Sequence, residues 1–265
     1  MMHFIDLLDF SVKKIRDLLK LGLLLKQDKI VDQSCLLAPF TLAMVFEKPS
    51  LRTRVSFEMA MHQSGGKAIQ LLPQEVGLGV REPVEDVARV LSRYVDCVML
   101  RTFSHQQLLK FSAASGVPVI NGLTDFSHPC QALADLLTIQ ETFGDSFDLL
   151  KVVFLGDYNN VSRSLAYMAS LLGFELVICC PKSFIPDEPL TGVSFSHDPA
   201  EAIRGAQVVY TDVWVSMGQE AESTARRTVF LPFQVTVDLM KLADPQAIFL
   251  HCLPAIRGEE VVASV

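Results

Sequence analysis

Short apolar runs alternate with segments of helical periodicity along this chain, and this alternation restricts its fold more than any other feature. Short runs bounded by turn residues predict buried strands, while apolar positions three and four residues apart predict helices between them. The predicted strands are Leu42–Phe46, Ala68–Leu71, Cys97–Leu100, Val117–Ile120, Val152–Leu155, Leu176–Cys179, Val208–Thr211 and Ile248–Leu250. Because this alternation is typical of parallel sheets covered by helices, we expect an α/β protein.

A polar break at residues 144–146 separates the chain into two halves. It follows Pro129–Phe143, which has the pattern of an amphipathic linking helix. A chain of 265 residues is long enough for two domains of ordinary size, each with its own core. We therefore predict two domains, residues 1–144 and 145–265, each a parallel sheet flanked by helices, with a cleft between them.

The composition excludes several classes of protein. Half of the residues are apolar and a fifth are charged, which is typical of a folded globular chain. The net charge of -7 makes a nucleic-acid partner unexpected, because phosphate backbones need a broad basic surface. The most apolar run, Leu18–Leu25, contains Lys20 and is too short to span a bilayer, and no signal peptide is evident.

The cysteines are scattered without Cys-x-x-Cys spacing. That distribution argues against a disulfide framework or a zinc site and favours the reducing cytoplasm. We expect neither a cluster of metal ligands nor a cofactor. The six cysteines are Cys35, Cys97, Cys130, Cys179, Cys180 and Cys252.

The segment Ser50–Arg54 lies where a strand gives way to a helix. The apolar run Leu42–Phe46 precedes it, and Val55 begins a helical pattern that stops at Gly65. A helix N-terminus aims backbone N–H groups and a positive dipole at one point, and arginine adds bidentate recognition of phosphate. The segment predicts an anion site, although a loop whose arginines pair with nearby carboxylates would have the same sequence.

Polar residues also follow the other predicted strands. Ligands of open α/β sheets bind beyond the carboxyl ends of the strands, so we expect these residues to form one site. Each has an ordinary alternative: a solvated arginine, a histidine or aspartate that caps a helix, or an inert buried thiol. The candidates are Ser50–Thr53, Arg101, His128, Gln131, Asp157–Asn160, Asp212–Met217 and His251–Leu253.

The segment Gly156–Asn160 occupies the position of a dinucleotide-binding fingerprint. It lacks the second and third glycines of that fingerprint, so we do not expect a dinucleotide there. Its two asparagines offer amides to a polar substrate instead.

Four motifs together resemble the ornithine carbamoyltransferases of the aspartate/ornithine carbamoyltransferase family. The similarity runs from about Phe4 to Val265, and the last two motifs separate the ornithine enzymes from the aspartate enzymes. The motifs are Ser50-Leu51-Arg52-Thr53-Arg54, His128-Pro129-Cys130-Gln131, Asp212-x-Trp214-x-Ser216-Met217-Gly218 and His251-Cys252-Leu253-Pro254.

The resemblance implies transfer of the carbamoyl group of carbamoyl phosphate to the δ-amine of L-ornithine, giving L-citrulline and phosphate. It also implies a homotrimer in the cytoplasm that takes part in arginine biosynthesis. By similarity, carbamoyl phosphate would be bound by Ser50, Leu51, Arg52, Thr53, Arg101, His128, Gln131, Cys252 and Leu253. Ornithine would be bound by Asn160, Asp212, Ser216 and Met217. The catalytic groups would be Arg101, His128, Asp212 and Cys252.

The chain departs from the family pattern at several positions. Leu51 replaces a threonine, and Gly77 replaces a polar residue that reaches the phosphate site of a neighbouring subunit. The family continues beyond Val265 into a helix that packs on the first domain, and Pro186–Ser196 is short and predicted to lack a helix. Two alternatives therefore stay open: an impaired relative that binds carbamoyl phosphate, and a transferase for another amine such as putrescine.

Overall fold

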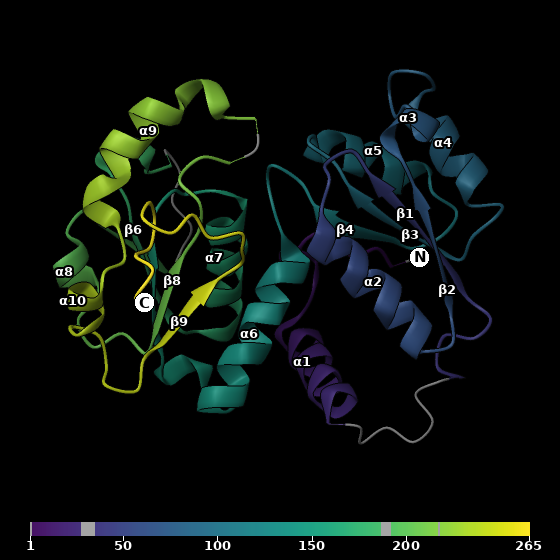
Figure 1. The fold of residues 1–265 in the computed structure, drawn as a ribbon. Helices are drawn as coiled ribbons and strands as arrows, with labels where there is room; N and C mark the ends of the chain where they lie inside the picture. The colour runs from purple at the N-terminus through teal and green to yellow at the C-terminus, as the bar shows by residue number, and fades with distance from the viewer. Residues whose placement is uncertain (1, 28–34, 187–191, 217) are drawn as a thin grey trace. The chain divides into compact units, whose positions relative to one another are not determined.

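The computed structural model describes residues 2–27, 35–186, 192–216 and 218–265. They form two compact units, Met1–Leu133 and Ala134–Val265, and Figure 1 shows a helix-flanked sheet in each. The division falls inside the linking helix, whereas the predicted boundary at residue 144 lies at the end of that helix. No helix in the described part of the chain is long and apolar enough to cross a membrane.

The first unit contains a four-stranded sheet with the order β2-β1-β3-β4, in which all neighbours are parallel. Its strands are β1 (Thr41–Phe46), β2 (Lys67–Leu71), β3 (Cys97–Arg101) and β4 (Val119–Leu123). Its helices are α1 (Val12–Lys26), α2 (Leu51–Gln63), α3 (Pro73–Val76), α4 (Val84–Leu91) and α5 (His105–Ala114).

Both faces of this sheet are buried along β1, β3 and β4, as is typical of a parallel sheet, whereas the edge strand β2 is only partly buried. Alternate residues of β1 enter different clusters because successive side chains of a strand point to opposite faces. Val45 packs with Leu108 and Phe111 of α5, whereas Met44 packs with Met61 and Phe57 of α2. The residue pattern of one strand therefore specifies two helical layers.

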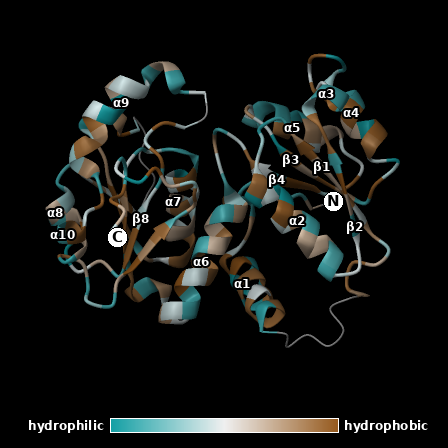
Figure 2. Ribbon diagram, viewed as in Figure 1, coloured by the Kyte–Doolittle hydropathy of each residue, from teal (hydrophilic) through white to brown (hydrophobic). Residues whose placement is uncertain are grey.

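The second unit contains a five-stranded parallel sheet with the order β7-β6-β5-β8-β9. Its strands are β5 (Lys151–Leu155), β6 (Glu175–Cys179), β7 (Val193–Ser196), β8 (Val208–Thr211) and β9 (Ile248–His251). Its helices are α7 (Asn160–Leu172), α8 (Pro199–Ala202), α9 (Ser223–Phe230) and α10 (Val237–Met240), and α6 (Pro129–Phe143) enters it from the first unit. Figure 2 shows that the strands are predominantly apolar.

The predicted α/β fold with two parallel sheets is confirmed, with local corrections. Helix α2 begins at Leu51 rather than Val55, because the Ser50 side chain caps it. Strand β7 was not predicted, because its sequence alternates valine and phenylalanine with serine and its residues are only partly buried. Ser11 caps α1, since its side chain accepts a hydrogen bond from the Lys14 backbone N–H.

Each sheet reverses its winding direction once. In the first unit β2 lies on one side of β1 and β3 lies on the other, and in the second unit β5 is flanked in the same way by β6 and β8. Ligands of open α/β sheets bind at such reversals, beyond the carboxyl ends of the strands. The residues that follow β1, β3, β5 and β8 therefore define where each unit can hold a ligand.

Candidate active site

The start of α2, which follows the carboxyl end of β1, has the features expected of an anion site. The Oγ of Ser50 accepts a hydrogen bond from the backbone N–H of Thr53 at 3.3 Å and donates one to the Thr53 Oγ1 at 3.0 Å. Arg52 is exposed within the first turn of this 13-residue helix. Backbone N–H groups, two hydroxyls and a guanidinium thus surround the positive end of a helix dipole.

Arg101 connects the end of β3 to this helix. It is the last residue of β3, only 7% exposed, and its Nη1 donates to the Thr53 Oγ1 at 3.2 Å. The alternative of a solvated arginine at a strand end is therefore wrong. Because β1 and β3 flank the reversal of the first sheet, this contact marks the point where a ligand is expected.

His128 follows β4 and begins α6. Its carbonyl oxygen accepts hydrogen bonds from the backbone N–H groups of Gln131 at 3.1 Å and Ala132 at 3.2 Å. Burial of the imidazole, together with the nearby Arg101 guanidinium, lowers the pKa of His128 to about 3. The ring is neutral near pH 7, so it can donate a hydrogen bond without adding a charge.

Sequence reasoning missed Lys48, which lies between the predicted strand Leu42–Phe46 and the segment Ser50–Arg54. The Lys48 side chain is 4% exposed, pairs with Asp125 and lies 4.2 Å from the centroid of the Phe103 ring. It therefore fixes the loop after β1 to the loop after β4. A lysine between a predicted strand and a predicted helix was the available signal, but nothing in the sequence indicates its burial.

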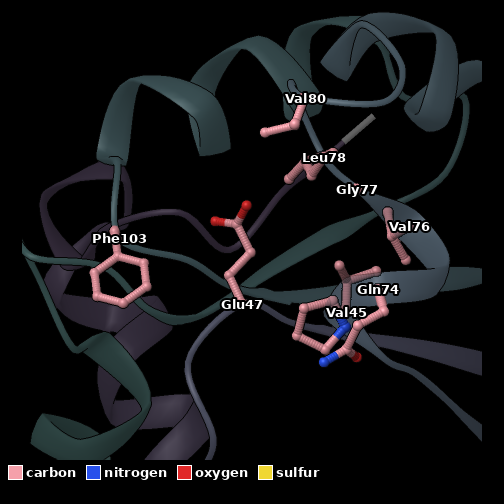
Figure 3. Close-up of a pocket in the computed structure, with 9 residues that line it drawn as sticks. Val45, Glu47, Gln74, Val76, Gly77, Leu78, Val80 and Phe103 are labelled. Atoms are coloured by element: carbon pink, nitrogen blue, oxygen red, sulfur yellow. The ribbon is translucent and has the colours of Figure 1, made fainter.

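A pocket of about 410 Å³ lies beside Glu47 in the first unit (Figure 3). Its lining is mostly apolar and includes Val80 and Phe103, and Glu47 is the charged side chain in it. A carboxylate in an apolar wall disfavours an anion. The predicted anion site therefore fits the start of α2 better than this pocket.

In the second unit, the reversal of the sheet is bridged by Asn159 and Asp212. Asn159 caps α7, since its Oδ1 accepts from the N–H groups of Val161 at 2.9 Å and Ser162 at 3.1 Å. Its Nδ2 donates to the Asp212 Oδ2 at 2.8 Å. The sequence offered both asparagines as candidates, and the family resemblance assigned ornithine to the neighbouring Asn160, which is the first residue of α7.

Cys252 lies beside the same carboxylate. Its Sγ donates to the Asp212 Oδ1 at 3.0 Å, and Asp212 is 8% exposed. Burial and the Asp212 carboxylate raise the pKa of the Cys252 thiol well above its usual value. The sulfur is therefore a protonated hydrogen-bond donor near pH 7 and not a thiolate nucleophile.

The loop after β8 is held by Arg226, another residue that sequence reasoning missed. Its Nε donates to the Trp214 carbonyl oxygen at 2.6 Å, and its guanidinium pairs with Asp157. Burial raises the pKa of Asp157, although Arg226 opposes that shift. Within the loop, the backbone N–H of Ser216 donates to Gln219 at 3.0 Å, and Met217 lies outside the described residues.

The expectation that no metal ligands cluster is wrong for the described residues. Possible ligand atoms of Asp212, His251 and Cys252 lie within 4.8 Å of one another. Both ring nitrogens of His251 are hydrogen-bonded, to Leu253 at 2.8 Å and Glu260 at 3.0 Å. A metal ion would have to displace one of these bonds and deprotonate the thiol.

The predicted residues thus fall into two groups, one in each unit. Ser50, Thr53, Arg101 and His128 supply donors and positive charge, which suit a phosphate and a polarised carbonyl. In the second unit, Cys252 and Asn159 both donate hydrogen bonds to the carboxylate of Asp212, and a carboxylate suits an amine. Leu253, predicted to bind carbamoyl phosphate together with Cys252, is in the second unit and 50% exposed.

Comparisons with known proteins agree along the whole chain. Residues 2–141 match the family described as aspartate/ornithine carbamoyltransferase, carbamoyl-P binding domain, and residues 148–265 match its Asp/Orn binding domain. The ornithine carbamoyltransferase of Methanothermobacter thermautotrophicus is 47% identical over 277 residues, covering 100% of this chain and 90% of that protein. The anabolic ornithine carbamoyltransferase of Pyrococcus furiosus is 48% identical, covering 97% and 85%.

Solved structures show the same relationship. The ornithine carbamoyltransferase from Pyrococcus furiosus superposes with a TM-score of 0.93 at 45% identity, covering 99% of this chain and 88% of that one. The anabolic enzyme from Campylobacter jejuni superposes with a TM-score of 0.91 at 40% identity, covering 100% and 90%.

Proposed function

The chain belongs to the aspartate/ornithine carbamoyltransferase family, and we propose that its two groups of side chains bind carbamoyl phosphate and L-ornithine, respectively. The protein transfers the carbamoyl group of carbamoyl phosphate to the δ-amine of L-ornithine, giving L-citrulline and phosphate. The observation that carries the assignment of residues is the buried Arg101, bonded to Thr53 at the start of α2.

The phosphate group binds at the start of α2. Ser50, Arg52, Thr53 and the backbone N–H of Leu51 hold its oxygens. The helix dipole and the guanidinium supply the positive charge. The replacement of threonine by leucine at residue 51 leaves this backbone donor in place, and the exposed side chain (74%) is not needed for it.

The carbamoyl group binds to Arg101, His128 and Gln131. Negative charge develops on the carbonyl oxygen during attack, and donors fixed in advance stabilise it. Neutral His128 donates there without repelling the guanidinium of Arg101. The loss of one such donor typically lowers kcat by about 100- to 1,000-fold.

Ornithine binds to Asn160, Asp212, Ser216 and Met217, with Cys252 and Leu253 where the two substrates meet. An alkylamine like that of lysine has a pKa of about 10.4, so presenting it neutral at pH 7 costs roughly 4–5 kcal/mol. Asp212 orients the amine. The nitrogen lone pair forms the new C–N bond, the C–O bond to phosphate breaks with its electron pair on phosphate, and Asp212 accepts the proton.

We propose a homotrimer in the cytoplasm, as expected for the family. An exposed apolar stripe on α2 supports association: Leu51, Val55 and Met59 are 74%, 46% and 43% exposed at a spacing of four residues. Contiguous apolar surface of this kind is typical of an interface. Cys97, Cys130, Cys179, Cys180 and Cys252 are free thiols, which suits a reducing compartment. Light scattering coupled to size exclusion measures the assembly directly.

The function is tested by measuring citrulline formation with ornithine, putrescine and aspartate offered in parallel, alongside calorimetric binding of carbamoyl phosphate. Product from ornithine alone is the expected result. Carbamoylated putrescine would select the alternative amine. Binding of carbamoyl phosphate without any product would show an impaired relative.

A further inference from the structure

A hydrogen-bonded chain of buried groups in the second unit involves two side chains to which the proposed function gives no role. The His251 and Glu260 side chains are 4% and 0% exposed, and the His251 Nε2 lies 3.0 Å from the Glu260 Oε1. Burying a carboxylate is costly unless hydrogen bonds compensate for its lost hydration. Such a group needs a structural or functional reason to be where it is.

The tautomer of His251 follows from its second contact. Its Nδ1 lies 2.8 Å from the backbone N–H of Leu253, so Nδ1 must accept. A neutral imidazole then carries its proton on Nε2, which donates to Glu260. The same Oε1 of Glu260 accepts from the backbone N–H of Ile256 at 2.6 Å.

Glu260 therefore holds the loop of residues 252–256 at both ends, through His251 at the start and Ile256 at the finish. Leu253 has φ of 60°, the only described non-glycine residue with a positive value. A leucine adopts this left-handed conformation only when its surroundings impose it. The Leu253 N–H bond to His251 is one such constraint.

The main chain of Glu260 is anchored by hydrogen bonds of the neighbouring backbone. Val235 donates from its N–H to the Glu260 carbonyl oxygen at 2.8 Å, and Val262 donates to the Val235 carbonyl oxygen at 3.0 Å. Between these bonds Val261 is buried in the core of the second unit. The position of Glu260 is thus set by the core, and the loop takes its position from Glu260.

We propose that Glu260 is a positioning residue for ornithine carbamoylation: acting through His251, it fixes the loop so that Cys252 stays against Asp212. The inference rests on the proposed function, because it assigns Asp212 and Cys252 to the ornithine side of the reaction. Glu260 touches neither substrate, so its loss affects the reaction only by moving the loop. A displacement of 1 Å at a reacting group can cost about 100-fold in rate.

The loop is tested directly by the alkylation rate of Cys252 with iodoacetamide, resolved by peptide mass spectrometry. Glu260→Ala should accelerate alkylation, because a displaced Cys252 loses its hydrogen bond to Asp212 and becomes more exposed to the reagent. Exposed Cys35 is the internal reference and should react at an unchanged rate. Glu260→Gln keeps an oxygen acceptor for His251 and Ile256 and should restore the slow rate. Unchanged Cys252 alkylation in Glu260→Ala would overturn the proposal.

The kinetic test separates positioning from general damage. Glu260→Ala should lower kcat/KM for ornithine by about 100-fold and leave the calorimetric Kd for carbamoyl phosphate unchanged. Glu259→Gln, which alters the neighbouring carboxylate paired with Arg227, is the matched control and should behave as wild type. Equal losses in both constants would contradict the proposal.

Two substitutions of His251 cover the case in which Glu260→Ala does not fold. The Asn oxygen in His251→Asn can replace Nδ1 as acceptor for Leu253, whereas the longer Gln in His251→Gln reaches toward Glu260 instead. Each variant keeps only one of the two hydrogen bonds of His251, so the proposal expects faster Cys252 alkylation and lower kcat/KM for ornithine in both. Wild-type values in both variants would overturn it. If wild type forms no citrulline, the proposed function fails, while the alkylation rates still decide whether Glu260 fixes the loop.

Discussion

Asn159 and Asp212 are joined across the reversal of the second sheet by a 2.8 Å hydrogen bond from Nδ2 to Oδ2. The same asparagine caps α7 through its Oδ1. One side chain therefore fixes both the start of a helix and the orientation of the carboxylate that we assign to the amine.

Because the two roles use different atoms, substitutions can separate them. Asn159→Ser keeps a capping oxygen but cannot reach Asp212, so we expect wild-type stability and a raised KM for ornithine. Asn159→Ala loses both and should also lower the free energy of unfolding by about 1 kcal/mol. Urea unfolding and steady-state kinetics measure the two effects. A normal KM in both variants would show that the bond to Asp212 does not matter for ornithine.

Thr53 receives hydrogen bonds from both Ser50 and Arg101, so its hydroxyl joins the residues that we assign to the phosphate and to the carbonyl group. Thr53→Val removes the hydroxyl at nearly constant volume, and we expect kcat to fall about 100- to 1,000-fold, as for the loss of an oxyanion donor. Thr53→Ser keeps the hydroxyl and is the matched control. Similar kcat values for the two variants would argue against the assigned role.

His128 makes stability depend on pH in a defined direction. Its folded pKa of about 3 lies below its ordinary value of 6.5, so the unfolded chain binds a proton that the folded chain does not. Stability should therefore fall on acidification below pH 6.5, by roughly 2 kcal/mol at pH 5 at 1.36 kcal/mol per unit.

Urea unfolding at several pH values measures this dependence. His128→Gln should flatten the curve between pH 6.5 and 5, whereas His62→Gln, at an exposed position of α2, should not. The same slope in all three proteins would mean that His128 is not the titrating group.

The buried Lys48 predicts an asymmetry between two substitutions. Asp125→Ala leaves the cation buried without its carboxylate, whereas Lys48→Met fills the same space without charge. Breaking one side of a buried pair typically costs about 3–5 kcal/mol, and replacing the charge with an apolar group costs less. Since Asp125 is largely exposed, we expect the lower end of that range. Thermal and urea unfolding should rank Asp125→Ala below Lys48→Met in stability, and the opposite order would contradict the burial of the cation.

The sequence was sufficient where a local pattern specifies the structure. Apolar runs such as Val208–Thr211 predicted the buried strands because a strand covered on both faces has no polar positions. Strand β7 was not predicted because Ser194 and Ser196 alternate with apolar residues, so that the segment lacks the continuous apolar run of the other strands. Both adjacent asparagines were candidates, and the structure was needed to show that Asn159 caps α7 and donates to Asp212.

The residues that were missed act over long separations. Arg226 meets Asp157 across 69 positions, and Lys48 meets Asp125 across 77. No periodicity links such pairs, since tertiary packing alone brings them together. The motifs located the groups that we assign to the substrates, but the buried charges that hold those groups required the structure.

Gly77 carries the last prediction, since the family resemblance implies a polar residue at this position. It has φ of 56°, and an added Cβ would lie 2.5 Å from the Cβ of Arg81. Restoring the family residue as Gly77→Gln should therefore destabilise the protein by at least about 1–2 kcal/mol, the cost of a left-handed conformation for a residue with a side chain. Arg81→Gly removes the clash but not the φ constraint, so Gly77→Gln in that background should recover part of the loss in urea unfolding. No loss in Gly77→Gln would show that the turn can rearrange, and the missing polar group could then be restored without cost.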